Sequence, residues 1–128
     1  MAENNAAMTL AEAIDAVEET YAYMLAYAAQ GRARDEAGDD GIRERLARAG
    51  EALAVIAAMA PAGDGEQHAA FVDMVRDDAV RARTALCFVL AQRAIGSQII
   101  DNLNASIHLR TLLTDLFLLD EALKIGAN

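Results

Sequence analysis

The side chains best suited to catalysis or metal binding are two histidines, His68 and His108, and a single cysteine, Cys87. A di-iron site in a helical bundle needs Glu-x-x-His on two helices. The residue three positions before His68 is Gly65, and the residue three positions before His108 is Ala105. One cysteine can form neither a thiolate zinc site nor an intrachain disulfide. We therefore expect neither a metal site nor any other cofactor.

Residues 106–114, SIHLRTLLT, resemble the phosphoacceptor helix of sensor kinases, which often reads S-H-E-L-R-T-P-L-T. Aligned on Leu-Arg-Thr, His108 takes the glutamate position of that motif, Ile107 takes the phosphoacceptor position and Leu112 takes the proline position. The resemblance implies a phosphoacceptor role for His108 as an alternative function. We favour the interpretation that His108 is an ordinary residue on the polar stripe of a leucine-rich helix. That stripe comprises Asp101, Asn104, His108, Thr111 and Asp115.

Other catalytic arrangements are not recognisable in the sequence. The glycine-containing segments GDDG and GDG are acidic and would repel phosphate, unlike a phosphate-binding loop. Ser97 and Ser106 lie near His108 in sequence, but a serine on a regular helix surface lacks an oxyanion site. We therefore expect that the protein is not an enzyme.

The charge of the chain excludes two classes of partner. The formal net charge is -9 over 128 residues, with a pI near 4.5, so phosphate backbones and anionic membrane surfaces repel it. We expect no binding to nucleic acid or to membranes. No stretch of the type found in signal peptides or membrane spans is evident, so we expect a cytoplasmic protein.

Alanine and leucine are abundant and glycine and proline are few, which predicts an all-α protein. We expect a single helical domain over residues 1–128, arranged as an antiparallel four-helix bundle with up-down-up-down topology. In this bundle the last two helices would be longer than the first two. The predicted helices cover residues 9–31, 41–60, 66–95 and 98–124.

Local signals set several of these boundaries. Thr9 and Glu12 have the spacing of a capping box at the start of the first helix. Pro61 ends the second helix because proline cannot continue the helical hydrogen bonds. Gly96 and Ser97 favour a tight turn between the last two helices, and a single continuous helix through this region is the alternative.

Apolar residues at alternating spacings of four and three predict which face of each helix is buried. For the first helix these residues are Leu10, Ile14, Val17, Tyr21, Met24 and Ala28. For the second they are Ile42, Leu46, Ala49, Leu53, Ile56 and Ala60, and for the third they are Val72, Val75, Ala79, Ala82, Leu86 and Val89. The last helix carries more apolar residues than one buried face requires, which predicts a homodimer that covers the excess.

Tyrosine and arginine, the residue types enriched at interface hot spots, gather around the first loop. The predicted partner-binding residues are Tyr23, Tyr27, Arg32, Arg34, Arg43 and Arg45, and Arg48 belongs to the same arginine cluster. In the alternative, the tyrosines complete the core and the arginines pair with nearby acidic residues. Those residues are Asp35, Glu36, Asp39, Asp40, Glu44 and Glu51.

Together these features predict a non-enzymatic interaction protein that binds a protein partner through helix–helix contacts, as an adaptor, assembly factor or export-type chaperone. In size, acidity and helical pattern the chain is similar to flagellar and type III secretion chaperones. The alternative is a regulatory or sensory bundle that accepts a phosphoryl group at His108 or binds a small ligand. A ligand of this kind would occupy a cavity near Cys87, Phe88 and His108.

Overall fold

The computed structural model describes residues 8–36, 41–61, 63–106 and 108–127, and these contain five helices and no strand. The helices are α1 (Leu10–Ala28), α2 (Ile42–Ala57), α3 (Glu66–Leu90), α4 (Ser97–Ala105) and α5 (His108–Ala127). The all-α prediction is confirmed. The structure has five helices where four were predicted, because the segment predicted as one helix over residues 98–124 is divided into α4 and α5.

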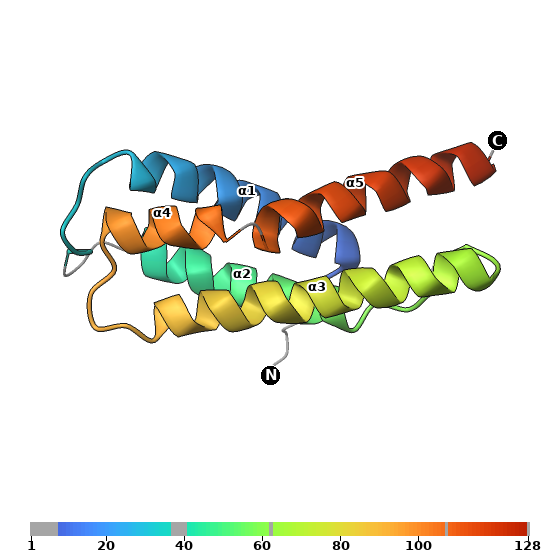
Figure 1. The fold of residues 1–128 in the computed structure, drawn as a ribbon, viewed down its shortest axis with the longest axis horizontal. Coiled ribbons are helices and arrows are strands. Elements are labelled where there is room, and N and C mark those ends of the chain that lie inside the picture. The colour runs from blue at the N-terminus through green and yellow to red at the C-terminus, as the bar shows by residue number, and fades with distance from the viewer. Residues whose placement is uncertain (1–7, 37–40, 62, 107, 128) are drawn as a thin grey trace.

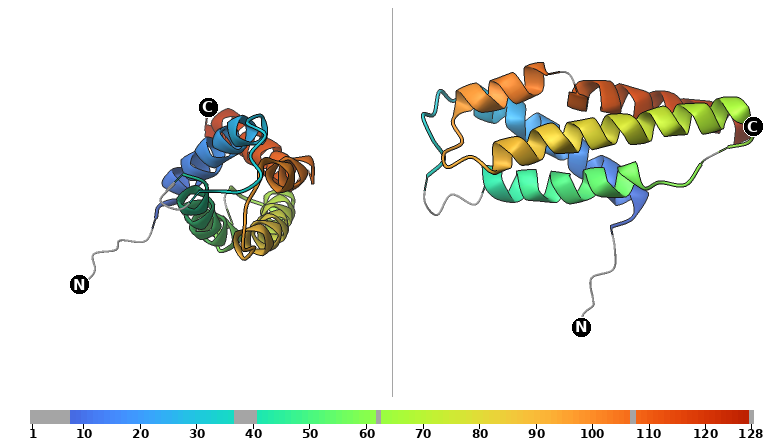
Figure 2. Two further views of the ribbon diagram at one scale, coloured as in Figure 1. Left: turned by 90° about the vertical axis from the view of Figure 1, so that its left-hand side faces the viewer. Right: turned by 60° about the horizontal axis from the view of Figure 1, so that its bottom comes forward.

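The helices lie side by side around a shared core (Figures 1 and 2). Helices α1, α2 and α3 alternate in direction, and α4 and α5 follow one another along the remaining side (Figure 1). Helix α4 packs mainly on α1, whereas α5 packs mainly on α3. The two ends of the molecule therefore differ. At one end the α1–α2 and α3–α4 connections meet, and at the other α3 and α5 extend past α1 and α2 (Figures 1 and 2).

Helix α1 begins at the predicted capping box. The Glu12 backbone N–H donates to the Thr9 hydroxyl at 3.1 Å, and the Thr9 backbone N–H donates to the Glu12 carboxylate at 2.9 Å. These two bonds satisfy amides that the first helical turn leaves without partners. They hold the pKa of the Glu12 carboxyl below its usual range.

The core follows the predicted apolar stripes closely in α2 and α3. All six residues predicted for α3 are buried, as are the five predicted residues that lie within α2; Ala60 lies beyond the end of α2 and is exposed. Helix α1 differs, because Leu10 is 37% exposed while Ala13, Ala16 and Tyr27 are buried. The buried face of α1 is therefore rotated toward its alanines.

The turn between α3 and α4 is longer than predicted. Helix α3 ends at Leu90 instead of near residue 95, and α4 begins at Ser97. The chain does turn here instead of continuing as one helix. Residues 91–96 form a connection whose backbone groups bond to other parts of the chain, as described below.

The division between α4 and α5 lies near Ser106. The Ser106 hydroxyl donates to the Leu103 carbonyl at 2.6 Å, and its backbone N–H donates to the carbonyls of Asn102 and Leu103. A serine side chain that bonds to a backbone carbonyl of the preceding turn competes with the regular helical pattern. We take this competition as the local reason for the division. Among the described residues, no helix is both long enough and apolar enough to cross a membrane.

Candidate functional site

At one end of the molecule, Asp35 of the α1–α2 connection and Arg43 of α2 form a salt bridge, and both residues also bond to the α3–α4 connection. The Arg43 Nε donates to the Asp35 carboxylate at 2.6 Å, and the Ile95 backbone N–H donates to the same carboxylate at 2.8 Å. Arg43 also donates to three carbonyls at the end of α3 and just after it, those of Leu90, Gln92 and Arg93, at 3.2, 3.0 and 3.0 Å. These donors stabilise the charged carboxylate and lower the pKa of Asp35 to about 2.

Ser97 and Tyr27 extend this network of hydrogen bonds. We call the network the clasp, and its residues are Tyr27, Arg32, Asp35, Arg43, Ile95 and Ser97. The Ser97 hydroxyl donates to the Tyr27 carbonyl at 2.7 Å and accepts from the Arg32 backbone N–H at 2.8 Å. The Ser97 backbone N–H donates to the Arg32 carbonyl at 2.9 Å. The Tyr27 hydroxyl donates to the Ile95 carbonyl at 2.5 Å. The clasp therefore holds together segments that lie more than 60 positions apart in the sequence.

Replacing Tyr27 by phenylalanine is expected to lower the free energy of unfolding by about 1–2 kcal/mol, because the buried Ile95 carbonyl loses its donor. Urea denaturation followed by circular dichroism measures the change. Tyr23→Phe is the matched control, since Tyr23 is half-buried and its hydroxyl has no hydrogen bond to the described residues. Equal losses in both variants would contradict the role assigned to the Tyr27 hydroxyl.

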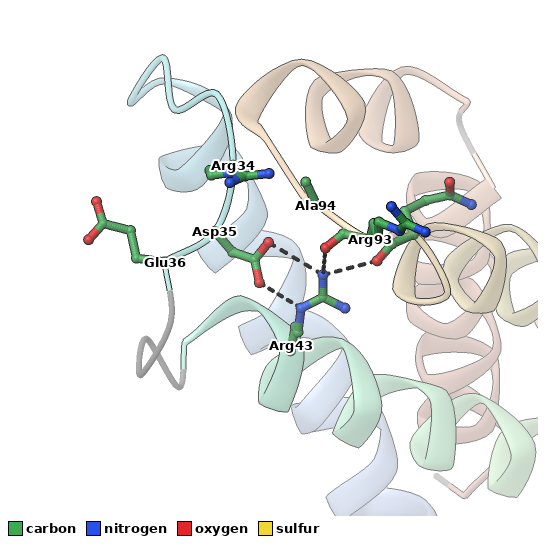
Figure 3. Close-up of a pocket in the computed structure, with 7 residues that line it drawn as sticks. Arg34, Asp35, Glu36, Arg43, Arg93 and Ala94 are labelled. Atoms are coloured by element: carbon green, nitrogen blue, oxygen red, sulfur yellow. Dashed lines mark hydrogen bonds and ion pairs between the residues drawn. The ribbon is translucent and has the colours of Figure 1, made fainter.

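A pocket of about 720 Å³ lies beside the clasp (Figure 3). It is lined by Arg34, Asp35, Glu36, Arg43, Gln92, Arg93 and Ala94. Arg43 is bound to Asp35, whereas Arg34 and Arg93 form no ion pair with the residues that the structure describes. The pocket therefore combines a rigid wall with two guanidinium groups that are available for an anionic ligand.

The predicted partner-binding residues are divided between the core, internal contacts and this pocket. Tyr27 is 1% exposed, so it is a core residue that cannot contact a partner in this conformation. The Arg32 guanidinium lies 4.9 Å from the Tyr27 ring centroid, and the Arg45 guanidinium lies 4.5 Å from that of Tyr23. Arg34 and Arg43 line the pocket. The structure thus satisfies much of the arginine cluster internally, while Asp39 and Asp40 lie outside the described residues.

Sequence reasoning about the first loop missed the other half of this pocket. Gln92, Arg93 and Ala94 come from the α3–α4 connection, which was predicted to be helix up to residue 95. In the sequence, Arg93 was the one residue that pointed to this side of the pocket. It continues the apolar stripe of the third predicted helix, so its charge would need a partner if it were buried. Arg93 is exposed instead, and its backbone carbonyl is the group that is bound.

A second, apolar groove lies between α3 and α5, with a volume of about 200 Å³. It is lined by Gln67, His68, Phe71, Leu118, Leu119 and Ala122. Leu118 is 59% exposed, and its neighbour Phe117 is 56% exposed. The last helix therefore carries two large apolar residues, Phe117 and Leu118, that the core leaves exposed.

The residues that flank the groove-lining residues along the chain are mostly acidic. The exposed residues Asp64, Glu66, Asp73, Asp120 and Glu121 lie close to the lining residues along the chain, together with Lys124. Lys124 pairs with Asp120 at 3.1 Å, and Arg76 pairs with Asp73 at 3.6 Å. The other three acidic residues, Asp64, Glu66 and Glu121, therefore have no salt bridge to the described residues.

Two carboxyl groups face each other between α3 and α5, those of Asp78 and Asp115. The Asp115 Oδ2 atom is buried and has no hydrogen bond to the described residues. Burial raises the pKa of Asp115 to about 7, and the neighbouring Asp78 carboxyl group contributes to the same shift. The polar stripe predicted for this helix is therefore partly buried, as Asn104 also shows.

Among the residues that the structure describes, neither histidine has a partner set typical of a catalytic site. His108 is half-buried at the start of α5, and His68 lines the apolar groove. Within the described part of the chain, no three His, Cys, Asp or Glu residues are grouped so that they could hold a metal ion. Phe88, expected beside a ligand cavity, is 67% exposed. A phosphoacceptor role for His108 stays an untested alternative.

Comparison with known proteins gives no further assignment: no family model, no curated protein and no solved structure matches the chain.

Proposed function

We propose that the protein is a non-enzymatic interaction protein, an adaptor, assembly factor or export-type chaperone, that binds an amphipathic helix of a protein partner in the α3–α5 groove. The observation that carries the proposal is Leu118, a large apolar side chain that is 59% exposed in an apolar groove between two helices. Exposed leucine side chains of this kind are stabilised when a partner covers them.

The shape of the groove suits a helix as the bound element. Two neighbouring antiparallel helices with an apolar furrow between them accept a third helix through residues spaced three and four positions apart. Phe71 and Leu118 contribute to opposite sides of the furrow, one from α3 and one from α5. Ala122 is small, which leaves room for a large side chain of the partner.

The charge around the groove supports a basic partner helix. Along the chain the lining residues are flanked by five acidic residues and by Lys124 and Arg76, and the whole chain carries a net charge of -9. A helix with lysine or arginine on its polar face would be attracted to this surface and oriented by it. A second copy of the chain would bring the same acidic residues together, which disfavours self-association at this groove.

The predicted homodimer would then use the neighbouring face of α5, where Phe117 is 56% exposed. In the same proposal, α4 and α5 together form the fourth member of an antiparallel four-helix bundle that makes up one domain. Light scattering of the purified protein measures the oligomeric state. If the protein is a dimer and Leu118→Asp dissociates it, a second copy of the chain occupies the groove. That result would overturn the proposed helical partner.

A designed peptide tests the groove directly. A fluorescently labelled amphipathic helix with leucines on one face and lysines on the other should bind with an affinity near the micromolar range at low salt. The same helix with glutamates in place of the lysines should bind at least about tenfold more weakly. Leu118→Asp should abolish the binding measured by fluorescence anisotropy.

Leu25→Asp is the matched control for Leu118→Asp. Leu25 is 50% exposed on α1, so the substitution introduces the same charge at a similarly exposed leucine outside the groove. If the lysine-bearing peptide bound through charge alone, the negative charge added by either substitution would strengthen its binding to both variants alike. That result, or binding that neither variant changes, would overturn the proposal.

A further inference from the structure

We propose that the pocket beside the clasp is a binding site for a small organic anion that carries carboxylate or phosphate groups. This inference is independent of the α3–α5 groove, which lies between different segments of the chain. The pocket is widely open to solvent, and its volume of about 720 Å³ is large enough for a small organic anion.

The charge balance of the pocket favours an anion. Three arginines and two acidic residues line it, and the Asp35 carboxylate is already bound to Arg43. Among the described lining residues, Glu36 is then the one acidic group that has no salt bridge and can offset the charges of Arg34 and Arg93. The local balance is therefore positive on a chain whose overall charge is -9, so this pocket differs in sign from the rest of the molecule.

The two available arginines approach the pocket from different segments. Arg34 belongs to the α1–α2 connection and Arg93 to the α3–α4 connection, with Ala94 between their side chains in the view of Figure 3. The small side chain of Ala94 leaves this space open. A guanidinium group presents a planar pair of N–H donors that matches a carboxylate or a phosphate, so two such groups can hold an anion from two sides.

The clasp holds the backbone of both segments in place before any ligand binds. Arg43 fixes the carbonyls of Gln92 and Arg93 at 3.0 Å, so the chain that carries the Arg93 side chain has little freedom. Arg34 lies between Arg32 and Asp35. The Arg32 backbone N–H donates to the Ser97 hydroxyl, and the Asp35 carboxylate accepts from the Ile95 backbone N–H. A site whose supporting backbone is already ordered loses less entropy on binding.

Titration calorimetry with citrate and with inorganic phosphate, at constant ionic strength, tests the site. We expect saturable binding of at least one probe with a dissociation constant of about 1 mM or tighter. The Arg34→Gln/Arg93→Gln double variant should weaken it by at least about tenfold, because both charged hydrogen-bond donors are lost. The probe that binds more tightly identifies the favoured group as carboxylate or phosphate.

The matched control is Arg48→Gln/Arg110→Gln, which removes the same charge from two exposed arginines outside the pocket. This control should retain the affinity of the unmodified protein, and unchanged circular dichroism should show that both variants are folded. If both double variants bound the probe equally weakly, the loss of affinity would be due to the overall charge of the chain and not to this pocket. That outcome overturns the proposal, as does the absence of saturable binding for both probes.

Discussion

Replacing Gly96 by alanine is expected to destabilise the protein by about 3 kcal/mol, near the upper end for overpacking a closely packed site. A Cβ atom at this position would lie 2.6 Å from the Ala33 carbonyl oxygen and 2.9 Å from the Arg32 carbonyl oxygen. Both are backbone atoms, and Arg32 is hydrogen-bonded to Ser97 through both its backbone N–H and its carbonyl. The methyl group can therefore be accommodated only if the clasp opens.

Gly50→Ala is the control, because it makes the same chemical change with the opposite expected result. Gly50 lies inside α2, and its added Cβ would lie 3.6 Å from a Leu86 methyl group, an ordinary contact distance. Alanine stabilises a helix interior by about 1 kcal/mol relative to glycine. Urea denaturation of both variants gives the free energies of unfolding. A Gly96→Ala protein as stable as the unmodified one would contradict the close approach of the two connections.

The sequence predicts the buried faces of α2 and α3 well because leucine, isoleucine and valine dominate them. Leu46, Leu53 and Leu86 are each fully buried, as their spacing indicates. A large aliphatic side chain contributes much more apolar surface to the core than alanine does, so it decides the orientation of its helix. Where such residues repeat regularly, periodicity is sufficient.

Helix α1 was less predictable, because alanine provides little information about burial. Ala13 and Ala16 are buried, whereas Leu10 is 37% exposed. Small residues allow two helices to approach closely, and a close helix pair buries alanines that a count of large apolar residues ignores. The hydroxyl of Tyr27 adds a further preference, since it reaches the Ile95 carbonyl only from the buried face.

The candidate site depends on contacts that no local pattern encodes. Arginines near the first loop were predicted to form a recognition surface, and Arg34 and Arg43 do line the pocket. The opposite wall exists because Arg43 bonds to the carbonyls of Gln92 and Arg93, 49 and 50 residues away. These tertiary bonds replace helical ones after Leu90, so the end of α3 is determined by α2.

Asp115 was similarly beyond a sequence-based prediction. It was assigned to a polar stripe, but the position of α5 against α3 places it opposite Asp78. An aspartate at a regular polar position gives no indication that a second carboxyl group faces it. The consequence is a dependence of stability on pH that an exposed stripe would not produce.

Asp115→Asn is expected to stabilise the protein at pH 8 and to have little effect near pH 4. Since the folded-state pKa of Asp115 is raised from 3.8 to about 7, the folded state holds a proton between these values that the unfolded state releases. Stability from this group is therefore lost as the pH rises from about 4 to 7 and stays low above 7. The full shift would correspond to about 4 kcal/mol, which we reduce to about 2 kcal/mol because the half-buried side chain is partly screened by solvent.

Asparagine remains neutral at every pH and offers an N–H to the Asp78 carboxylate, so it avoids the cost of a second negative charge. Urea denaturation of both proteins at pH 4 and pH 8 separates this effect from a general gain in stability. Asp101→Asn removes one negative charge from an exposed position on α4 and should change stability by less than about 0.5 kcal/mol at either pH. A gain from Asp115→Asn that is equal at both pH values would show that packing, and not ionisation, limits the α3–α5 contact. A gain confined to pH 8 would mean that the helix pair forming the proposed partner groove is held less firmly once Asp115 is charged.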